Sequence, residues 1–173
     1  MINQDKIKYS LIIKFLMRIF EMFKRLYCNI RTSYLILSIN QIGKGNIFDD
    51  NITIHRPENL KIGDKNFFGK NTYLIAHGEI EFGNSVAIAS DCKFITRNHI
   101  YKNKDIPISD QSYEYKSIKI SDNCWFGFNV IVLPGVTLGK GCIIAAGSVV
   151  TKSFQDYSII AGVPAKLIKK NDN

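Results

Sequence analysis

A histidine stands at the start of a long interruption in an otherwise regular part of this chain. His99, within ITRNHIY, precedes residues 100–117, which are polar and aromatic and include Pro107. An imidazole exchanges its proton close to neutral pH, so a histidine at the root of such a loop can act as a general base. Histidines in surface loops are often merely solvated, and position alone leaves both interpretations open.

Three of the four cysteines share one position in a repeating pattern. Cys92, Cys124 and Cys142 each stand four residues after a regularly spaced apolar residue, and the chain contains no CxxC pair. Buried thiols commonly pack as small apolar groups, and this interpretation is favoured over a disulfide or a metal site.

Apolar residues recur every six positions through most of the chain. This period suits neither an α-helix nor a flat sheet and is typical of the hexapeptide repeat of a parallel β-helix. The series beginning at Ile42, Ile62 and Phe82 imply coils of 20 residues, and those beginning at Ile120 and Leu138 imply coils of 18. The pattern predicts a mainly β triangular prism whose stacked coils need caps at both ends. The repeating residues are Ile42, Phe48, Ile54, Leu60, Ile62, Phe68, Leu74, Ile80, Phe82, Ile88, Phe94, Ile120, Phe126, Val132, Leu138, Ile144 and Val150.

The length of 173 residues and the hydrophobic content of 46% suit one such domain. We expect the β-helix over residues 40–173, with an excursion loop at 100–117 and a C-terminal tail at 155–173. The excursion is where function is expected, because long loops on rigid repeat scaffolds usually carry it.

Residues 1–39 have apolar residues at helical spacing and carry seven Lys and Arg against Asp5 and Glu21, a net +5 of the chain's +8. We expect one or two amphipathic helices that cap the first coil, with contact to anionic lipid as the alternative. A spanning helix needs about 20 apolar residues, which this stretch lacks. No cleavable signal and no nucleic-acid motif is found, so we expect a cytoplasmic protein, with any lipid contact at the inner face of the membrane.

The segments DNCWFG, PGVTLGKG, GSVVTK and AGVPAK together resemble the hexapeptide-repeat acetyltransferases, specifically the galactoside, maltose and xenobiotic O-acetyltransferase group. The resemblance covers about residues 42–170. It implies a left-handed parallel β-helix, a homotrimer with acetyl-CoA bound between subunits, and no metal. In that family a histidine just before the protruding loop is the general base, and His99 matches it.

Further site residues follow from the resemblance. Trp125 matches a tryptophan that lines the cofactor and acceptor groove, and Phe128 departs from the family's serine or alanine close to the cofactor. Asn71 aligns with an acceptor-binding asparagine, although a corner residue of the prism is an equal alternative, and Glu114 lies near a loop glutamate thought to assist catalysis. The positions that match contacts to acetyl-CoA are Ala146, Thr151, Lys152, Lys166 and Lys169.

The resemblance implies direct acetyl transfer to a sugar hydroxyl, in surface polysaccharide or lipopolysaccharide assembly, with His99 taking the proton. N-acetylation of a nucleotide-linked amino sugar is the main alternative. An inactive scaffold is a weaker one, as is a zinc enzyme similar to the gamma-type carbonic anhydrases. A zinc site requires all of its ligands within about 2.1 Å of one ion. His55, His77 and His99 instead stand one, three and five residues after the preceding apolar residue of the six-residue repeat.

Overall fold

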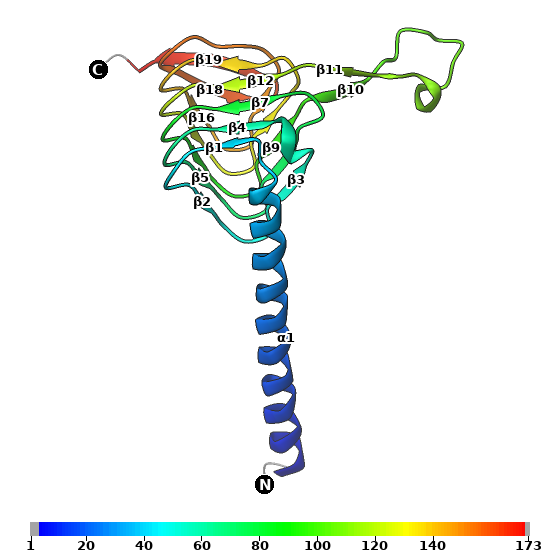
Figure 1. Ribbon diagram of the computed structural model, residues 1–173, viewed down its shortest axis with the longest axis vertical. Coiled ribbons are helices and arrows are strands. Elements are labelled where there is room, and N and C mark those ends of the chain that lie inside the picture. The colour runs from blue at the N-terminus through cyan, green and yellow to red at the C-terminus, as the bar shows by residue number, and fades with distance from the viewer. Residues whose placement is uncertain (1–3, 172–173) are drawn as a thin grey trace.

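The computed structural model describes residues 4–171 and consists of one long helix followed by a parallel β-helix (Figure 1). Each coil contributes a short strand to each of three sheets, so the solenoid is a triangular prism. The predicted fold class, a left-handed parallel β-helix of hexapeptide repeats with one protruding segment, is confirmed.

The three sheets, here A, B and C, form the three faces of the prism. Sheet A contains β1 (Gln41–Ile42), β4 (Leu60–Ile62), β7 (Ile80–Phe82), β12 (Ile118–Ile120) and β15 (Thr137–Leu138). Sheet B contains β2 (Ile47–Phe48), β5 (Phe67–Phe68), β8 (Ala87–Ile88), β13 (Trp125–Phe126), β16 (Ile143–Ile144), β18 (Ser158–Gly162) and β19 (Ala165–Lys170). Sheet C contains β3 (Thr53–His55), β6 (Tyr73–Ile75), β9 (Lys93–Ile95), β14 (Ile131–Val132) and β17 (Val149–Val150).

The strand register confirms the predicted coil lengths. Ile42 pairs with Ile62 and Ile62 with Phe82, which are steps of 20 residues, whereas Ile120 pairs with Leu138, a step of 18. Phe82 pairs with Ile120 across the excursion. The additional residues of the 20-residue coils lie at the edge between sheets C and A, where the short helix η1 (Pro57–Asn59) forms.

The predicted repeat residues fill the prism, and those from Ile54 onwards are buried. Phenylalanine rings of successive coils stack or meet edge to face, with 4.7 Å between the ring centroids of Phe48 and Phe68 and 5.2 Å between those of Phe94 and Phe126. Such contacts favour one register of the coils.

The three repeat cysteines are buried and free, as predicted. The Cys92 and Cys124 thiols donate to the carbonyl oxygens of Gly127 and Gly139, each at 3.2 Å, in the next coil. Burial raises the pKa of the Cys92 thiol, so this sulfur packs as a neutral group.

The edge between sheets B and C turns through residues with left-handed backbone. Asn51, Asn71, Asp91 and Asn129 have φ angles of 60°, 58°, 64° and 55°. Asparagine and aspartate tolerate this conformation better than most other residues. The Asn71 side chain accepts a hydrogen bond from Asn51 Nδ2 at 2.8 Å and donates one to Asp91 Oδ1 at 3.1 Å.

The excursion leaves the prism earlier than predicted and is partly regular. The Lys116 N–H donates to the Thr96 carbonyl at 3.0 Å, which places the root of the excursion at residue 96 rather than 100. Strands β10 (Arg97–His99) and β11 (Tyr113–Tyr115) then pair antiparallel and project from the body (Figure 1). His99 is therefore a residue of this ribbon and not the last residue before the departure.

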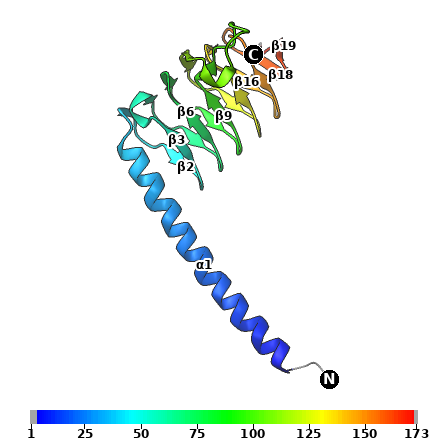
Figure 2. The same cartoon turned by 90° about the vertical axis from the view of Figure 1, so that its right-hand side faces the viewer.

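Helix α1 (Gln4–Leu37) occupies the segment in which the sequence predicts one or two amphipathic helices. It is one continuous helix, and its C-terminal end meets the solenoid (Figures 1 and 2). Just after that end, Ile39 enters the core. The N-terminal part of the helix extends past the first coil. Most of its large apolar side chains with described exposure are exposed. Among the helices of residues 4–171, none is long and apolar enough to cross a bilayer.

Candidate functional site

His99 is held on one face of the β10–β11 ribbon. It pairs with Tyr113, and their ring centroids lie 4.3 Å apart. The Arg97 guanidinium carbon lies 4.5 Å from the centroid of the same tyrosine ring. Tyr113 thus supports the imidazole from one side, while the His99 side chain stays exposed to solvent.

The far end of the excursion is tied together by one side chain. Gln111 Nε2 donates to the carbonyl oxygens of Asn103 at 2.8 Å and Ile106 at 2.9 Å, next to the short helix η2 (Ile108–Asp110). Ile100 N–H donates to Ser112 O at 2.9 Å and extends the ribbon by one bond. These bonds give the excursion a defined shape at both ends.

Glu114 lies in the same ribbon but is opposite Asn98. Because side chains alternate between the two faces of a ribbon, Glu114 points away from the face that carries His99 and Tyr113. Its carboxylate pairs with Lys116 Nζ at 3.0 Å. Within one chain the structure does not bring Glu114 to His99.

Trp125 and Ala146 lie on sheet B and at the neighbouring B–C edge. Trp125 is 55% exposed between Ala87 and Ile143 of the adjoining coils. Beside it, a Cβ on Gly127 would lie 2.6 Å from the Ala146 backbone nitrogen, so the close approach of these two corners requires glycine. Phe128 is also exposed at this edge.

The remaining predicted contacts to acetyl-CoA lie at the C–A edge and on the last strand of sheet B. Thr151 and Lys152 are exposed at the C–A edge after β17, the same edge from which the ribbon leaves. Lys166 and Lys169 are exposed on β19, which pairs antiparallel with β18 at the end of sheet B. Lys170 is bound instead to the chain itself, through the Asp156 carbonyl at 2.6 Å.

These positions fit an anionic, extended cosubstrate such as acetyl-CoA. Exposed ammonium groups at residues 152, 166 and 169 suit phosphates, and exposed Trp125 suits an apolar or planar group. The corner beside Ala146 is open, since a Cβ on Gly147 would meet nothing within 4 Å.

One chain does not assemble all of these residues into one site. His99, Thr151 and Lys152 belong to the C–A edge, whereas Trp125, Ala146, Lys166 and Lys169 belong to sheet B and the B–C edge. The width of sheet C separates the two edges. Asn71 lies at the B–C edge and forms the side-chain ladder of that corner.

All three histidines lie near the C–A edge, although they follow different repeat positions. Residues 4–171 contain no group of three or more His, Cys, Asp or Glu arranged to hold a metal ion. The pKa of His77 is lowered by burial and by the positive charges of Arg97 and Arg56.

Tyr113 and Arg97 are candidate site residues that the motifs in the sequence do not indicate; Tyr113 lies against His99, and Arg97 lies against Tyr113. The sequence does contain a signal for these residues. Arg97 and His99 are two residues apart, as are Tyr113 and Tyr115, and this spacing places each pair on one face of a β-strand. The polar composition of the segment obscured that spacing.

Comparison with known families and proteins agrees with this architecture. The model of the bacterial transferase hexapeptide family, with six repeats, matches residues 117–152. A Mycobacterium tuberculosis protein described as a probable acetyltransferase is 35% identical over 130 residues, covering 75% of this chain and 43% of that protein. A Staphylococcus aureus protein that also carries acetyltransferase in its name is 38% identical over 135 residues, covering 72% and 64%. The chain thus spans less than two thirds of the length of either relative.

Two solved structures share the fold. A maltose O-acetyltransferase from Clostridium difficile 630 superimposes with a TM-score of 0.76 at 26% identity, covering 88% of each chain. A hexapeptide-repeat acetyltransferase from Vibrio cholerae, crystallised with acetyl coenzyme A, gives a TM-score of 0.76 at 24% identity, covering 84% of this chain and 78% of the other. At that identity the second structure supports the fold alone.

Proposed function

Because the chain belongs to the hexapeptide-repeat acetyltransferase family, we propose that it transfers the acetyl group of acetyl-CoA to a sugar hydroxyl. The observation that carries the proposal is His99, an exposed imidazole that lies against the Tyr113 ring in the protruding ribbon. The likeness to a maltose O-acetyltransferase favours a hydroxyl over an amine. We assign the acceptor to the sugars from which surface polysaccharides are assembled.

His99 acts in this proposal as the general base. Acetyl-CoA supplies the acetyl group as a thioester, which an acceptor hydroxyl can attack directly. A neutral imidazole nitrogen of His99 takes the hydroxyl proton as the new ester bond forms, and returns a proton toward the departing thiolate. The supporting contact with Tyr113 reduces the freedom of the ring and so lowers the cost of orienting it.

The complete site is proposed to form between subunits of a homotrimer. The separation of His99 from Trp125 by the width of sheet C supports this arrangement. His99, Thr151 and Lys152 of one chain would face Trp125, Ala146, Lys166 and Lys169 of the next. Asn71 and Glu114 are proposed to contact the acceptor from this interface.

The test is a panel of sugar and amino-sugar acceptors incubated with acetyl-CoA, followed by release of the free thiol. The wild type should acetylate at least one sugar, and hydroxylamine should cleave the product because it is an ester. His99→Ala should lower transfer by roughly 10²- to 10⁴-fold, the contribution of a general base. Acetyl-CoA should still raise the melting temperature of His99→Ala, because the base is not needed for binding.

A matched control is His55→Ala, which changes an exposed histidine on sheet C. This variant should transfer at the wild-type rate. Transfer by His99→Ala at the wild-type rate would remove His99 from the mechanism, and a hydroxylamine-stable amide product would point to an amino sugar.

A further inference from the structure

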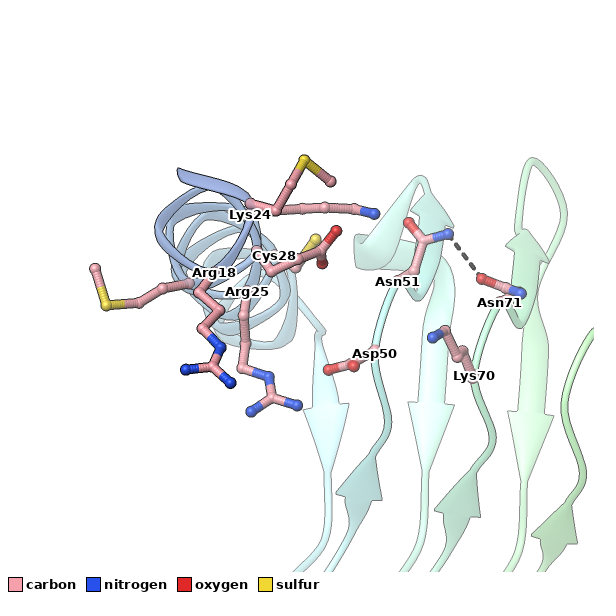
Figure 3. Close-up of a pocket in the computed structure, with 11 residues that line it drawn as sticks. Arg18, Lys24, Arg25, Cys28, Asp50, Asn51, Lys70 and Asn71 are labelled. Carbon is pink, nitrogen blue, oxygen red and sulfur yellow. Dashed lines mark hydrogen bonds between the residues drawn. The ribbon is translucent and has the colours of Figure 1, made fainter. Parts of the chain in front are cut away.

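Helix α1 presents its polar face to its own solenoid. The cleft between them, with a volume of about 790 Å³, is lined on the helix side mainly by polar residues and on the solenoid side by two B–C corners. Figure 3 shows Lys24 and Cys28 pointing toward the corners that carry Asn51 and Asn71, with Arg18 and Arg25 on the lower flank. The helix therefore does not use its apolar face to pack on the coil beside it.

The apolar face points away from the cleft and is exposed. Phe15, Phe20 and Phe23 are 63%, 60% and 59% exposed, which is unusual for large rings that recur on one helix face. The same face carries Ile12, Leu16, Leu26, Tyr27, Ile30 and Tyr34.

This face is too wide for a simple seam between helices. A coiled coil needs two apolar positions per heptad, with charged residues beside them. The stripe of Leu16, Phe23 and Ile30 is instead bordered by Phe15 on one side and by Phe20, Tyr27 and Tyr34 on the other. A partner helix would leave part of these rings in water.

Basic residues border the wide apolar face on both sides. At 3.6 residues per turn, Arg18 and Arg25 fall along one boundary, on the flank of the cleft, and Arg31 falls along the other. Lys14 lies within the polar face, and Lys24 points toward the solenoid. Glu21, the one acidic residue of the sequence between positions 6 and 48, falls in the middle of the polar face. An interfacial helix has this arrangement, in which long basic side chains reach headgroups while aromatic and aliphatic groups enter the acyl boundary.

We propose that α1 lies in the plane of an anionic membrane surface, with its apolar face in the lipid and its polar face toward the solenoid. The charge of the boundaries selects anionic headgroups. The solenoid faces the cleft residues of α1, so the exposed apolar face on the opposite side of the helix is free to reach the bilayer. The partner is a lipid surface of negative charge, and this contact does not depend on the acetyl-transfer proposal.

The test is sedimentation of the purified full chain with vesicles of phosphatidylcholine alone or of phosphatidylcholine mixed with phosphatidylglycerol. Binding should require phosphatidylglycerol and weaken as salt is raised. Arg18→Gln with Arg25→Gln should weaken binding roughly fivefold for each cation removed, from about 1 kcal/mol per charge. Phe20→Ser with Phe23→Ser should weaken it further.

The controls are Lys102→Gln and Ile108→Ser, which change an exposed cation and an exposed apolar side chain on the excursion. Both should bind vesicles like the wild type. The proposal is overturned if the wild type fails to bind anionic vesicles at low salt, or if the α1 variants bind as well as the controls. It is also overturned if Phe20→Ser with Phe23→Ser lowers the oligomeric mass in light scattering without lipid, because the face would then cover a second copy.

Discussion

At the scale of single residues, the arrangement around His99 is a cluster of three side chains centred on Tyr113. Arg97, Tyr113 and His99 lie on the same face of the ribbon, and both the guanidinium and the imidazole lie close to the tyrosine ring. A ring held in this way samples fewer orientations than a free surface histidine. Tyr113 is therefore a positioning residue, because it acts through His99.

Replacing Tyr113 tests this role. Tyr113→Ala should lower kcat by roughly 10- to 100-fold, because a loosely held base is misplaced for proton transfer. Tyr113→Phe keeps the ring and should restore most of the rate, and the KM for acetyl-CoA should stay unchanged in both variants. Steady-state kinetics would measure these values with whichever sugar of the acceptor panel the wild type acetylates. Equal loss in both variants would mean that the phenol oxygen, and not the ring, is required.

At the scale of elements, the corners decide how closely successive coils approach. The Gly127 corner lies against the Ala146 corner, and a methyl group there would lie 2.6 Å from the Ala146 nitrogen and 3.1 Å from the Ile144 oxygen. Both neighbours are backbone atoms, which move only if the coils separate. This packing also sets the surface beside Trp125, which is proposed to receive the cosubstrate.

Gly127→Ala should therefore lower the free energy of unfolding by about 1–3 kcal/mol, the usual cost of overpacking. Gly78→Ala is a suitable control, because its nearest neighbours would lie 3.4 Å away, in ordinary contact. Denaturant unfolding of both variants would compare them. A Gly127→Ala protein as stable as the control would show that the coils separate at little cost.

At the scale of the whole molecule, the C–A edge, which carries His99, and the B–C edge beside Trp125 lie apart within one chain. The proposed site therefore needs residues from two subunits. His99 and Trp125 of one chain lie on different parts of the prism, divided by sheet C. Closed symmetric oligomers can join two such surfaces of neighbouring copies. If the proposed trimer forms the site, its assembly should be needed for catalysis and not only for stability.

Mixing two inactive variants tests this arrangement. His99→Ala and Trp125→Ala should each transfer slowly alone. If they are unfolded and reassembled together in equal amounts, about a quarter of the sites should combine an intact His99 with an intact Trp125 from different chains. The rate of thiol release should recover to a similar fraction. A mixture no faster than the average of the separate variants would mean that both residues act within one chain.

The repeat period determined the larger part of the fold. Six-residue spacing of Ile120, Phe126 and Val132, with coil steps of 20 and 18 residues, predicted three short parallel strands per coil, and the register confirms it. This succeeded because each coil contacts only its neighbours, so local spacing in sequence sets the contacts in space. The burial of Cys92, Cys124 and Cys142 followed from the same spacing.

Only the tertiary structure decided where the non-repeating parts lie. An amphipathic pattern shows that α1 has an apolar face, but the partner of that face depends on surfaces distant in sequence. The ribbon that joins His99 to Tyr113 depends on pairing across a loop, which composition does not specify. The sequence alone therefore determined the solenoid and the identity of the candidate base. The tertiary structure decided the direction of the helix, the support of that base and its separation from Trp125, because these arise from contacts that no repeat encodes.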